Sequence, residues 1–537
     1  MTSQPAGPGT AHDGRPAAAT TPGVPHSAGR WWALVAIAAS VLVVGLDLTV
    51  LNLALPDIAV SLHASTADLQ WIADSYSLVL AALILPAGLL GDRYGRKRIL
   101  LIALVLFGAS SLACAYATSV GELIAARAVL GVGAAAIFPL ALSVLPVLFT
   151  QEERPKAIAG ISGATMLSFP IGPIVGGFLL SHFWWGSVFL INVPIVVLAL
   201  VAVVFLLPES RSARRPSIDL PGLVVSSAGL IALTYGFIKA GQDGWSDATA
   251  EALIAAGAVA LALLYFVERR IARRGGQPLA DLQLFRSPGF RWGTILATLV
   301  SFVMFGMFFA LPQYFQDVRG ASPLGSGLRL LPMVAGMLVG MVSGTRLKAP
   351  RIAITAGYLV MAAAMGLGAL TTLTSSTGYT LAWVGLAGLG LGLVMPGAMG
   401  AALGDLSAER SGAGSALLTA LRQVGSTIGV AILGTVIGNA YASGVAGAAA
   451  QLPAQAAAAV RSSVGAGVAA AQQLGSPELL DTVRTSFVHG MSLMLWICGG
   501  IAVGCAILAV TVLKARPRAV APNPTDADAA AGSLPVG

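Results

Sequence analysis

Residues 31–56 read WWALVAIAASVLVVGLDLTVLNLALP, a stretch in which Asp47 is the single charged side chain. A hydrocarbon layer about 30 Å thick needs roughly 20 apolar residues for one helical crossing, and this stretch is long enough. A carboxylate in the middle of such a helix costs roughly 2.5–3.5 kcal/mol on insertion scales, so acids at this depth are rare and functional by default. The stretch therefore predicts a membrane-spanning helix with a functional acid at Asp47.

The whole chain has the composition of an all-α polytopic membrane protein. Hydrophobic residues make up 56% of its 537 residues, charged residues make up 10%, and the mean hydropathy is +0.83. The apolar runs are continuous, whereas the strands of a membrane barrel would alternate polar and apolar residues, so the spans are predicted to be helices. Fourteen crossings are expected, near residues 31–55, 70–90, 99–117, 122–147, 158–180, 187–207, 219–239, 250–267, 292–314, 326–345, 352–373, 381–403, 413–440 and 487–513.

The formal net charge of +8 follows the predicted loops. Segments 61–68 and 241–248 have no lysine or arginine, whereas the loops that alternate with them hold basic clusters at 93–98, 154–156, 211–215 and 269–274. Basic loops favour the cytoplasmic side of a membrane. With an even number of crossings, both termini are then expected in the cytoplasm, and the positive charge orients the chain instead of binding nucleic acid.

The predicted spans divide into two halves of six helices, residues 31–207 and 292–513, with two inserted helices and their linkers at 208–291. A faint repeat supports the halves, because AGLLGDRYGRKRILL (87–101) is echoed by SGTRLKAPRIAI (343–354). Two polar tails remain, and both are predicted to be disordered in the cytoplasm. The tails are residues 1–30 and 514–537.

Two further charged side chains lie inside predicted spans. Asp74 falls about one turn inside the outer end of the second span, and Arg127 falls about 7–8 Å inward from Glu122 in the fourth. Because the first span runs outward and the other two run inward, Asp47, Asp74 and Arg127 share the outer half of the membrane and can meet. Burial favours a neutral carboxyl group and a nearby guanidinium favours a charged one, so such a cluster is suited to bind and release a proton.

Simpler roles for the two acids stay open at this point. Asp47 could be a structural tie that hydrogen-bonds to neighbouring helices, aided by Thr49 and Asn52. Asp74 lies near enough to the membrane surface to reach water.

The segment GLLGDRYGRKR (88–98) follows the second span and places one acid among several bases. Its glycines permit a tight turn, and the acid could dock near a helix N-terminus or pair with an arginine. An ordinary basic cytoplasmic loop is the alternative. The predicted conformational latch consists of Gly88, Asp92, Arg93, Gly95 and Arg96.

The fifth span contains SFPIGPIVGG (168–177), which is unusually dense in proline and glycine. Proline bends a helix, and glycine lets a second helix approach closely. Simple packing is the alternative to a specialised contact. The residues concerned are Pro170, Gly172, Pro173, Gly176 and Gly177.

Together these segments resemble the major facilitator superfamily, specifically its fourteen-span drug:proton antiporters of the EmrB/QacA type. LDLTVLNLALP (46–56) resembles the first-helix signature, and GLLGDRYGRKR (88–98) resembles the loop motif. RAVLGVG (127–133) resembles the proton-coupling motif of helix four, and GPIVGG (172–177) resembles the antiporter motif. FLINVP (189–194) and LPQYFQDVRGASPLGSGLRLLP (311–332) also have the look of that subfamily. Two positions depart from the pattern, since Leu130 replaces a common Gln and Ser168 a common Gly.

The resemblance implies alternating access, in which two halves rock around a central cavity. Asp47 would carry the proton, Arg127 would tune it, and Asp74 would hold a second proton or contact a cationic substrate. The substrate cavity would involve Asp74, Asn52 and Tyr76. The antiporter motif would seal the interface between the halves, and the loop with Asp92 would stabilise one conformation.

The expected substrates are lipophilic, cationic or neutral drugs, exported across a bacterial plasma membrane by a monomer in exchange for protons. A dedicated metabolite exporter and a proton-coupled importer are the alternatives, and GPIVGG argues against the importer. Arg329 and Arg422 lie near predicted helix ends and are expected to snorkel to water. No H-E-x-x-H, G-x-S-x-G or P-loop pattern occurs, which argues against an embedded enzyme and an ATP-driven pump. Neither cofactor nor metal is expected.

Overall fold

The computed structural model describes residues 27–150, 153–210, 220–244, 246–273, 282–347, 350–404, 406 and 408–513. Every regular element within these residues is a helix. The first part of the chain forms α1 (Ser27–Ser61), α2 (Thr66–Tyr94), α3 (Arg96–Ala115), α4 (Val120–Ser143), α5 (Leu145–Leu148), α6 (Arg154–His182), α7 (Ser187–Leu190) and α8 (Asn192–Leu206).

The second part of the chain begins with a pair of helices, α9 (Leu220–Asp243) and α10 (Ala248–Arg273), which pack against each other. The remaining elements are η1 (Leu282–Arg286), α11 (Pro288–Gln313), η2 (Tyr314–Val318), α12 (Pro323–Arg346), α13 (Pro350–Ala369), α14 (Thr377–Leu403), α15 (Ala408–Ala449), α16 (Ala454–Ser462), α17 (Val464–Gln473) and α18 (Pro477–Val512).

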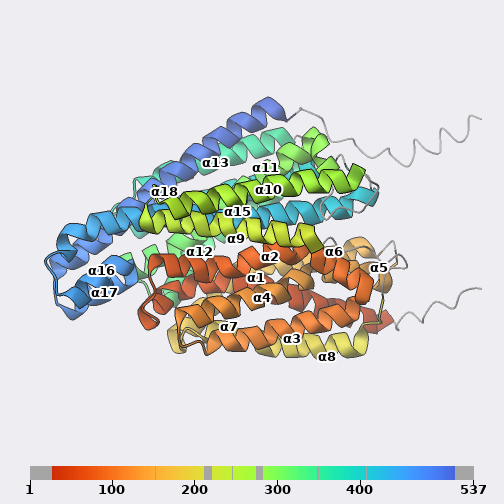
Figure 1. Ribbon diagram of the computed structural model, residues 1–537, viewed down its shortest axis with the longest axis horizontal. Helices are drawn as coiled ribbons and strands as arrows, with labels where there is room; N and C mark the ends of the chain where they lie inside the picture. Colours follow the sequence, from red (N-terminus) through yellow and green to blue (C-terminus); the bar gives the residue numbers. More distant parts are fainter. Residues whose placement is uncertain are drawn as a thin grey trace, which may run out of the picture.

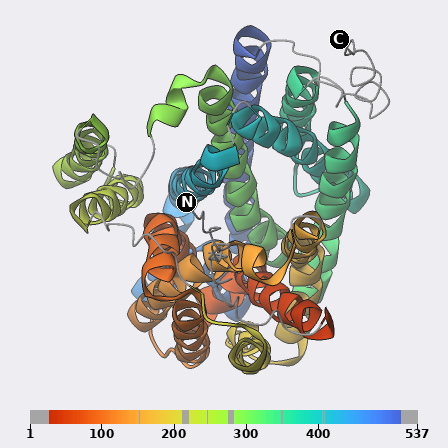
Figure 2. The ribbon, with the colours of Figure 1, turned by 90° about the vertical axis from the view of Figure 1, so that its right-hand side faces the viewer.

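The long helices run side by side along the longest axis of the molecule (Figure 1). The short helices α16 and α17 lie at one end, which we call the hairpin end. The first described residue of α1 and the last of α18 lie at the opposite end, which we call the terminal end. Figure 2 shows two groups of helices, α1–α8 and α11–α18, with the α9–α10 pair at their side. The groups touch where α2 packs on α15 and α6 packs on α12.

Serine side chains begin several of these helices. Ser65 accepts a hydrogen bond from the backbone of Asp68, whose carboxylate in turn accepts from the backbone of Ser65. The side chains of Ser119 and Ser322 likewise accept a hydrogen bond from a backbone N–H in the first turn of α4 and of α12. Since the first N–H groups of a helix have no partner within it, such caps fix where the helix starts.

A helix of at least 15 residues coincides with each predicted crossing. Among the described residues, eleven helices are long and apolar enough to cross a membrane, and two shorter apolar segments, Ile171–His182 and Val224–Ala240, accompany them. The described part of the chain therefore has an all-helical architecture with about eleven clear candidate membrane spans.

Three boundaries differ from expectation. Residues 27–30, predicted as part of a disordered tail, begin α1, and Arg30 forms an ion pair of 2.8 Å with Glu153 that ties them to the start of α6. The sixth crossing is broken at Ile191 into α7 and α8. The thirteenth crossing, expected to end at residue 440, continues to Ala449 as part of α15, because the alanine-rich sequence there favours helix. The rest of both predicted tails lies outside the described residues.

Candidate functional site

Asp47 and Arg127 form a buried ion pair. The Nη1 atom of Arg127, on α4, donates to Oδ2 of Asp47 near the middle of α1, and both side chains are 1% exposed. The sequence-based prediction that these two residues meet is confirmed. Such a pair is stable only where further hydrogen bonds satisfy its remaining atoms, because both charges have lost their water.

Arg127 is held on three sides by other helices. Its Nε atom donates to the backbone carbonyl of Ile72 on α2 at 3.1 Å. Its guanidinium carbon lies 4.7 Å from the ring centre of Tyr76 and 5.9 Å from that of Phe189. Aromatic faces attract a cation, most strongly where water is excluded. The arginine is therefore fixed in one orientation toward Asp47.

Asn192 completes the site from the other side. Its Nδ2 atom donates to Oδ1 of Asp47 at 3.5 Å and to Ser111 on α3 at 3.3 Å. The sequence motifs do not single out Asn192, although FLINVP contains it. The available signal was an isolated amide in an otherwise apolar span, which is expensive in lipid unless it is bonded. Each oxygen of Asp47 thus has a donor from a different helix.

Asp74 does not join this pair. It is 1% exposed, so the alternative that it reaches water is wrong, and within the described residues neither of its oxygens has a hydrogen-bond partner. The α2 residues that contact Arg127 are Ile72 and Tyr76, four positions apart on one face of the helix. Asp74 lies midway between them in sequence, which turns it about 160° away around the helix.

The face of α2 that carries Asp74 points at the other half of the molecule. Gln70, one turn earlier on the same face, donates to the backbone of Ala431 on α15 at 3.3 Å. Residues four apart on a helix share a face. Asp74 therefore belongs to the contact between the two groups of helices, whereas Asp47 and Arg127 lie wholly within the first.

Two other predicted site residues have local roles. Tyr76 is fully buried under the Arg127 guanidinium. Asn52 donates to the backbone of Leu48 in its own helix at 2.9 Å. The Thr49 hydroxyl likewise donates to a backbone carbonyl of α1 and to the carbonyl of Ser168. Thr49 and Asn52 therefore do not bond to Asp47, although the alternative in which Asp47 is a structural tie expected their help.

The proline- and glycine-rich segment of α6 packs on the part of α1 that holds Asp47. A Cβ atom at Gly172 would collide with Thr49, and one at Gly176 would lie 2.7 Å from a methyl carbon of Val50. Ser168, the departure from the family pattern, is accommodated by Gly45, where a Cβ atom would collide with the serine hydroxyl. The glycine on α1 thus leaves room for the serine on α6 at this contact.

The opposite side of the same segment contacts the second half. A Cβ atom at Gly177 would lie 2.7 Å from the Cα atom of Leu324 on α12, and one at Gly327 would collide with the carbonyl of Pro173. The two backbones approach this closely because both helices carry glycine. The side chain of Pro170 lies outside the described part of the structure.

The loop after α2 turns at Gly95, whose φ of +114° suits glycine. Glu209, which follows α8, accepts hydrogen bonds of 3.2 Å from the backbone N–H groups of Lys97 and Arg98. An acid at these free N–H groups stabilises the helix start. Glu209 was not among the predicted latch residues.

The predicted latch residues lie beside different parts of the chain. The backbone N–H of Arg96 donates to the carbonyl of Ser210 at 2.8 Å, and the Arg93 guanidinium lies 5.5 Å from the ring centre of Tyr94. A Cβ atom at Gly88 would make an ordinary contact of 3.6 Å with Pro139 on α4. The side chain of Asp92 lies outside the described residues.

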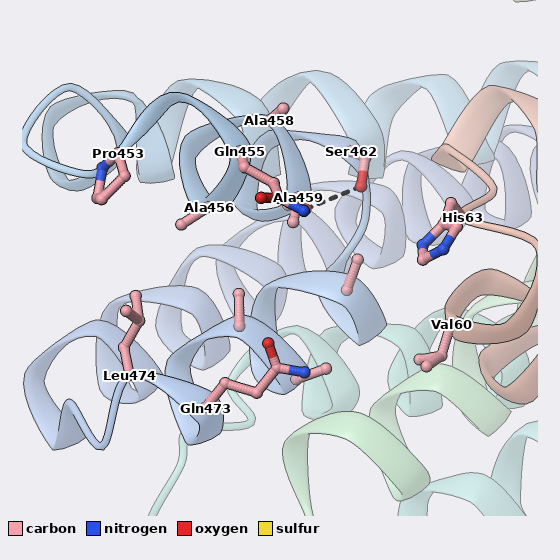
Figure 3. A pocket seen from close by; sticks show the side chains of 13 residues that line it. Val60, His63, Pro453, Gln455, Ala456, Ala458, Ala459, Ser462, Gln473 and Leu474 are labelled. Carbon is pink, nitrogen blue, oxygen red and sulfur yellow. Dashed lines mark hydrogen bonds between the residues drawn. The ribbon is translucent and has the colours of Figure 1, made fainter.

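A cavity of about 710 Å³ lies at the hairpin end, between the last turn of α1 and the α16–α17 pair (Figure 3). Alanine is the commonest residue in its lining, and the polar groups there include His63, Gln455 and Gln473. Val60, on its wall, is 13 residues from Asp47, or roughly 20 Å along the helix. The cavity is thus separate from the ion pair, and none of Asp74, Asn52 and Tyr76 lines it.

Comparison with family models matches residues 37–430, most of the chain, to the Major Facilitator Superfamily. The chain belongs to this superfamily. Membership makes it a multi-pass membrane transporter of small molecules and not an enzyme.

This major facilitator has close relatives among bacterial exporters. It is 35% identical to the tetracenomycin C resistance and export protein of Streptomyces glaucescens, over 95% of this chain and 97% of that protein. It is 36% identical to the multidrug efflux pump LfrA of Mycolicibacterium smegmatis, over 78% of this chain and 82% of the pump.

Its fold is similar to that of a bacterial homolog of the human lysosomal transporter Spinster, solved in an inward-facing and occupied conformation. The TM-score is 0.68 at 17% identity, covering 92% of this chain and all of that one. At this identity the likeness concerns the major facilitator fold alone.

Proposed function

We propose that this major facilitator exports lipophilic drugs or antibiotics in exchange for protons. The observation that carries the proposal is the buried pair of Asp47 and Arg127, held by four further side-chain or backbone contacts inside the first group of helices. The names of the relatives, which are a resistance and export protein and an efflux pump, support the direction of transport.

Asp47 is the proposed proton carrier. When Asp47 is ionised, its attraction to Arg127 joins α1 to α4 in a dry environment where ion pairs are sensitive to the loss of either charge. A proton on Asp47 removes that attraction and leaves Arg127 with the carbonyl of Ile72 and its aromatic neighbours. Protonation would then shift the balance between two packings of α1 against its neighbours, as alternating access requires.

The close contact of α6 with α12 is the proposed seal between the halves. It joins the Gly172–Gly177 segment, which also packs beside Asp47, to the first turns of α12. A change in α1 packing therefore reaches the interface between halves through one helix. The resemblance of GPIVGG (172–177) to the antiporter motif, together with the names of the relatives, favours an exporter of the EmrB/QacA type over the importer alternative.

We further propose that all fourteen long helices cross the plasma membrane of a bacterium, as 6+2+6, in a monomer. The basic clusters at 93–98, 154–156 and 269–273 lie at or beside helix ends at the terminal end, and by the positive-inside rule this supports the proposal that both termini are cytoplasmic. On this view residues 31–207 and 292–513 are the moving halves, and 208–291 is an insertion.

A drug-susceptibility panel tests the proposal in an efflux-deficient bacterial host. Expression of the wild-type chain is expected to protect the host against several dyes, quaternary ammonium compounds or antibiotics, and Asp47→Asn is expected to abolish protection while still reaching the membrane. Normal protection by the variant would remove Asp47 from the mechanism. Protection against no compound would favour a dedicated metabolite exporter.

A further inference from the structure

Arg422 is a cation in the interior of the second half. It lies 14 residues after the start of α15, and its half-buried side chain donates from Nε to the hydroxyl of Ser301 at 3.3 Å. Ser301 is 1% exposed and stands at the midpoint of α11. The guanidinium is therefore at mid-bundle, and not near a helix end as expected from the sequence.

The direction of the side chain also excludes snorkelling. A Cβ atom at Gly425 would lie 2.6 Å from the carbonyl of Thr298, so these two positions of α15 and α11 are level. Both helices run from the terminal end to the hairpin end. Arg422 is three residues before Gly425, whereas its partner Ser301 is three residues beyond Thr298. The side chain thus reaches toward the middle of the bundle, away from the nearer end.

The hydrogen-bonding capacity of Arg422 is largely unused. A guanidinium has five N–H donors and a full charge, and a neutral serine hydroxyl satisfies one donor. No aspartate or glutamate forms an ion pair with it in the described ranges. The amide nitrogen of the next residue, Gln423, is buried and also lacks a partner among the described residues.

The surroundings suit a lipophilic molecule. Phe305 lies one turn beyond Ser301 on the same face of α11, is partly buried, and has its ring 6.3 Å from that of Phe308. An apolar aromatic surface with a few fixed donors is the usual composition of a small-molecule site. A planar fork of N–H donors matches a carboxylate or another anionic oxygen.

We propose that Arg422 binds an anionic oxygen of the transported molecule, so that the substrates include lipophilic carboxylic acids, ionised phenols or enolates. This inference rests on the proposed export function and changes its substrate class, since the sequence by itself favours cationic or neutral compounds. Arg422 lies on α15 and bonds to α11, whereas the proposed proton carrier Asp47 lies on α1 and pairs with α4, so recognition of an acidic group and proton carriage occupy different groups of helices.

The test uses the full-length chain in proteoliposomes with an imposed proton gradient and a matched pair of probes, an aromatic carboxylic acid and its methyl ester. Arg422→Gln is expected to lower uptake of the acid by about tenfold, as for the loss of one charge-assisted bond, and to leave the ester unchanged. Arg422→Lys should recover part of the acid transport. Arg329→Gln, at a half-buried arginine of α12, is the matched control and should change neither.

Each other outcome has a defined meaning. Transport of the ester but not the acid by the wild type, or an equal loss of both in Arg422→Gln, overturns the assignment of Arg422 while export stands. Rescue of Arg422→Gln by Asp74→Asn also overturns it, because the two charges would then pair with each other in another conformation. Absence of gradient-driven transport of every probe by the wild type overturns the proposed function itself, and with it this inference.

Discussion

Asn192, the first residue of α8, donates a hydrogen bond of 3.5 Å to the Oδ1 atom of Asp47 on α1. Since Arg127 bonds to Oδ2, the carboxylate is held between α4 and α8. The acid is therefore oriented by two donors of different kinds, a charge and an amide. Such outer partners commonly fix a reactive group in its working geometry.

Asn192→Ala is expected to lower proton-driven efflux several-fold without preventing membrane insertion, because Asp47 loses a donor and Ser111 loses a partner. Asn52→Ala is the matched control, since Asn52 bonds to its own helix backbone. Dye efflux from energised cells measures both. Equal losses in the two variants would mean that Asn192 has no special part.

Arg127→Lys is expected to abolish most coupling even though the charge is kept. A lysine ammonium cannot bond to Asp47 and to the Ile72 carbonyl from one rigid plane while lying over the Tyr76 ring. Substrate-induced proton movement in proteoliposomes measures this coupling. Full coupling in the lysine variant would show that charge alone, without orientation, is sufficient.

Gly176→Ala is expected to destabilise the protein by about 1–3 kcal/mol, because the new methyl group would overlap Val50 on α1. Gly163→Ala is the matched control on the same helix, since a Cβ atom there meets no atom within 4 Å. Thermal unfolding of the two variants in detergent gives the comparison. Equal midpoints would contradict the close packing of α6 on α1.

Glu209→Ala is expected to weaken the start of α3 by about 1 kcal/mol, a typical loss for a helix cap. The readout is hydrogen exchange at the amides of Lys97 and Arg98, which donate to this carboxylate. Exchange there should quicken, while the amide of Glu122, which is capped by Ser119 on α4, stays protected. Unchanged exchange at both α3 amides would show that Glu209 does not cap α3 in solution.

Asp74→Asn is expected to leave folding intact, because the carboxylate has no hydrogen-bond partner among the described residues that the change would remove. Loss of protection against cationic but not neutral compounds would assign Asp74 to recognition. Loss against both would indicate a second proton carrier. An unchanged susceptibility profile would show that this buried acid has no part in transport.

Much of the fold followed from the length of apolar runs. A charge inside such a run is costly, which drew attention to Asp47, Asp74 and Arg127 before any contact was known. The pairing of the first and third was predictable from depth along the membrane. Depth could not exclude Asp74, because the rotation of α2 about its axis decides which side chain faces α4.

Other parts of the site depend on contacts between distant segments. Asn192 reaches Asp47 because the chain breaks at Ile191 between α7 and α8, whereas one continuous crossing was expected over 187–207. Glu209 caps α3 across more than 100 residues. The side chain of Arg422 was expected to extend toward water at a helix end. The register of α15 against α11 shows that it extends toward the middle of the bundle instead.

The sequence by itself determined that this is a helical membrane protein and singled out Asp47, Asp74 and Arg127 as charges inside its apolar spans, because hydrophobicity and the cost of a buried charge are properties of single segments. Only the tertiary structure decided which helix faces meet: Asp47 with Arg127 and Asn192, α6 with α1 and α12, and Arg422 with Ser301. Those choices depend on the rotation and relative register of packed helices, which no one segment specifies.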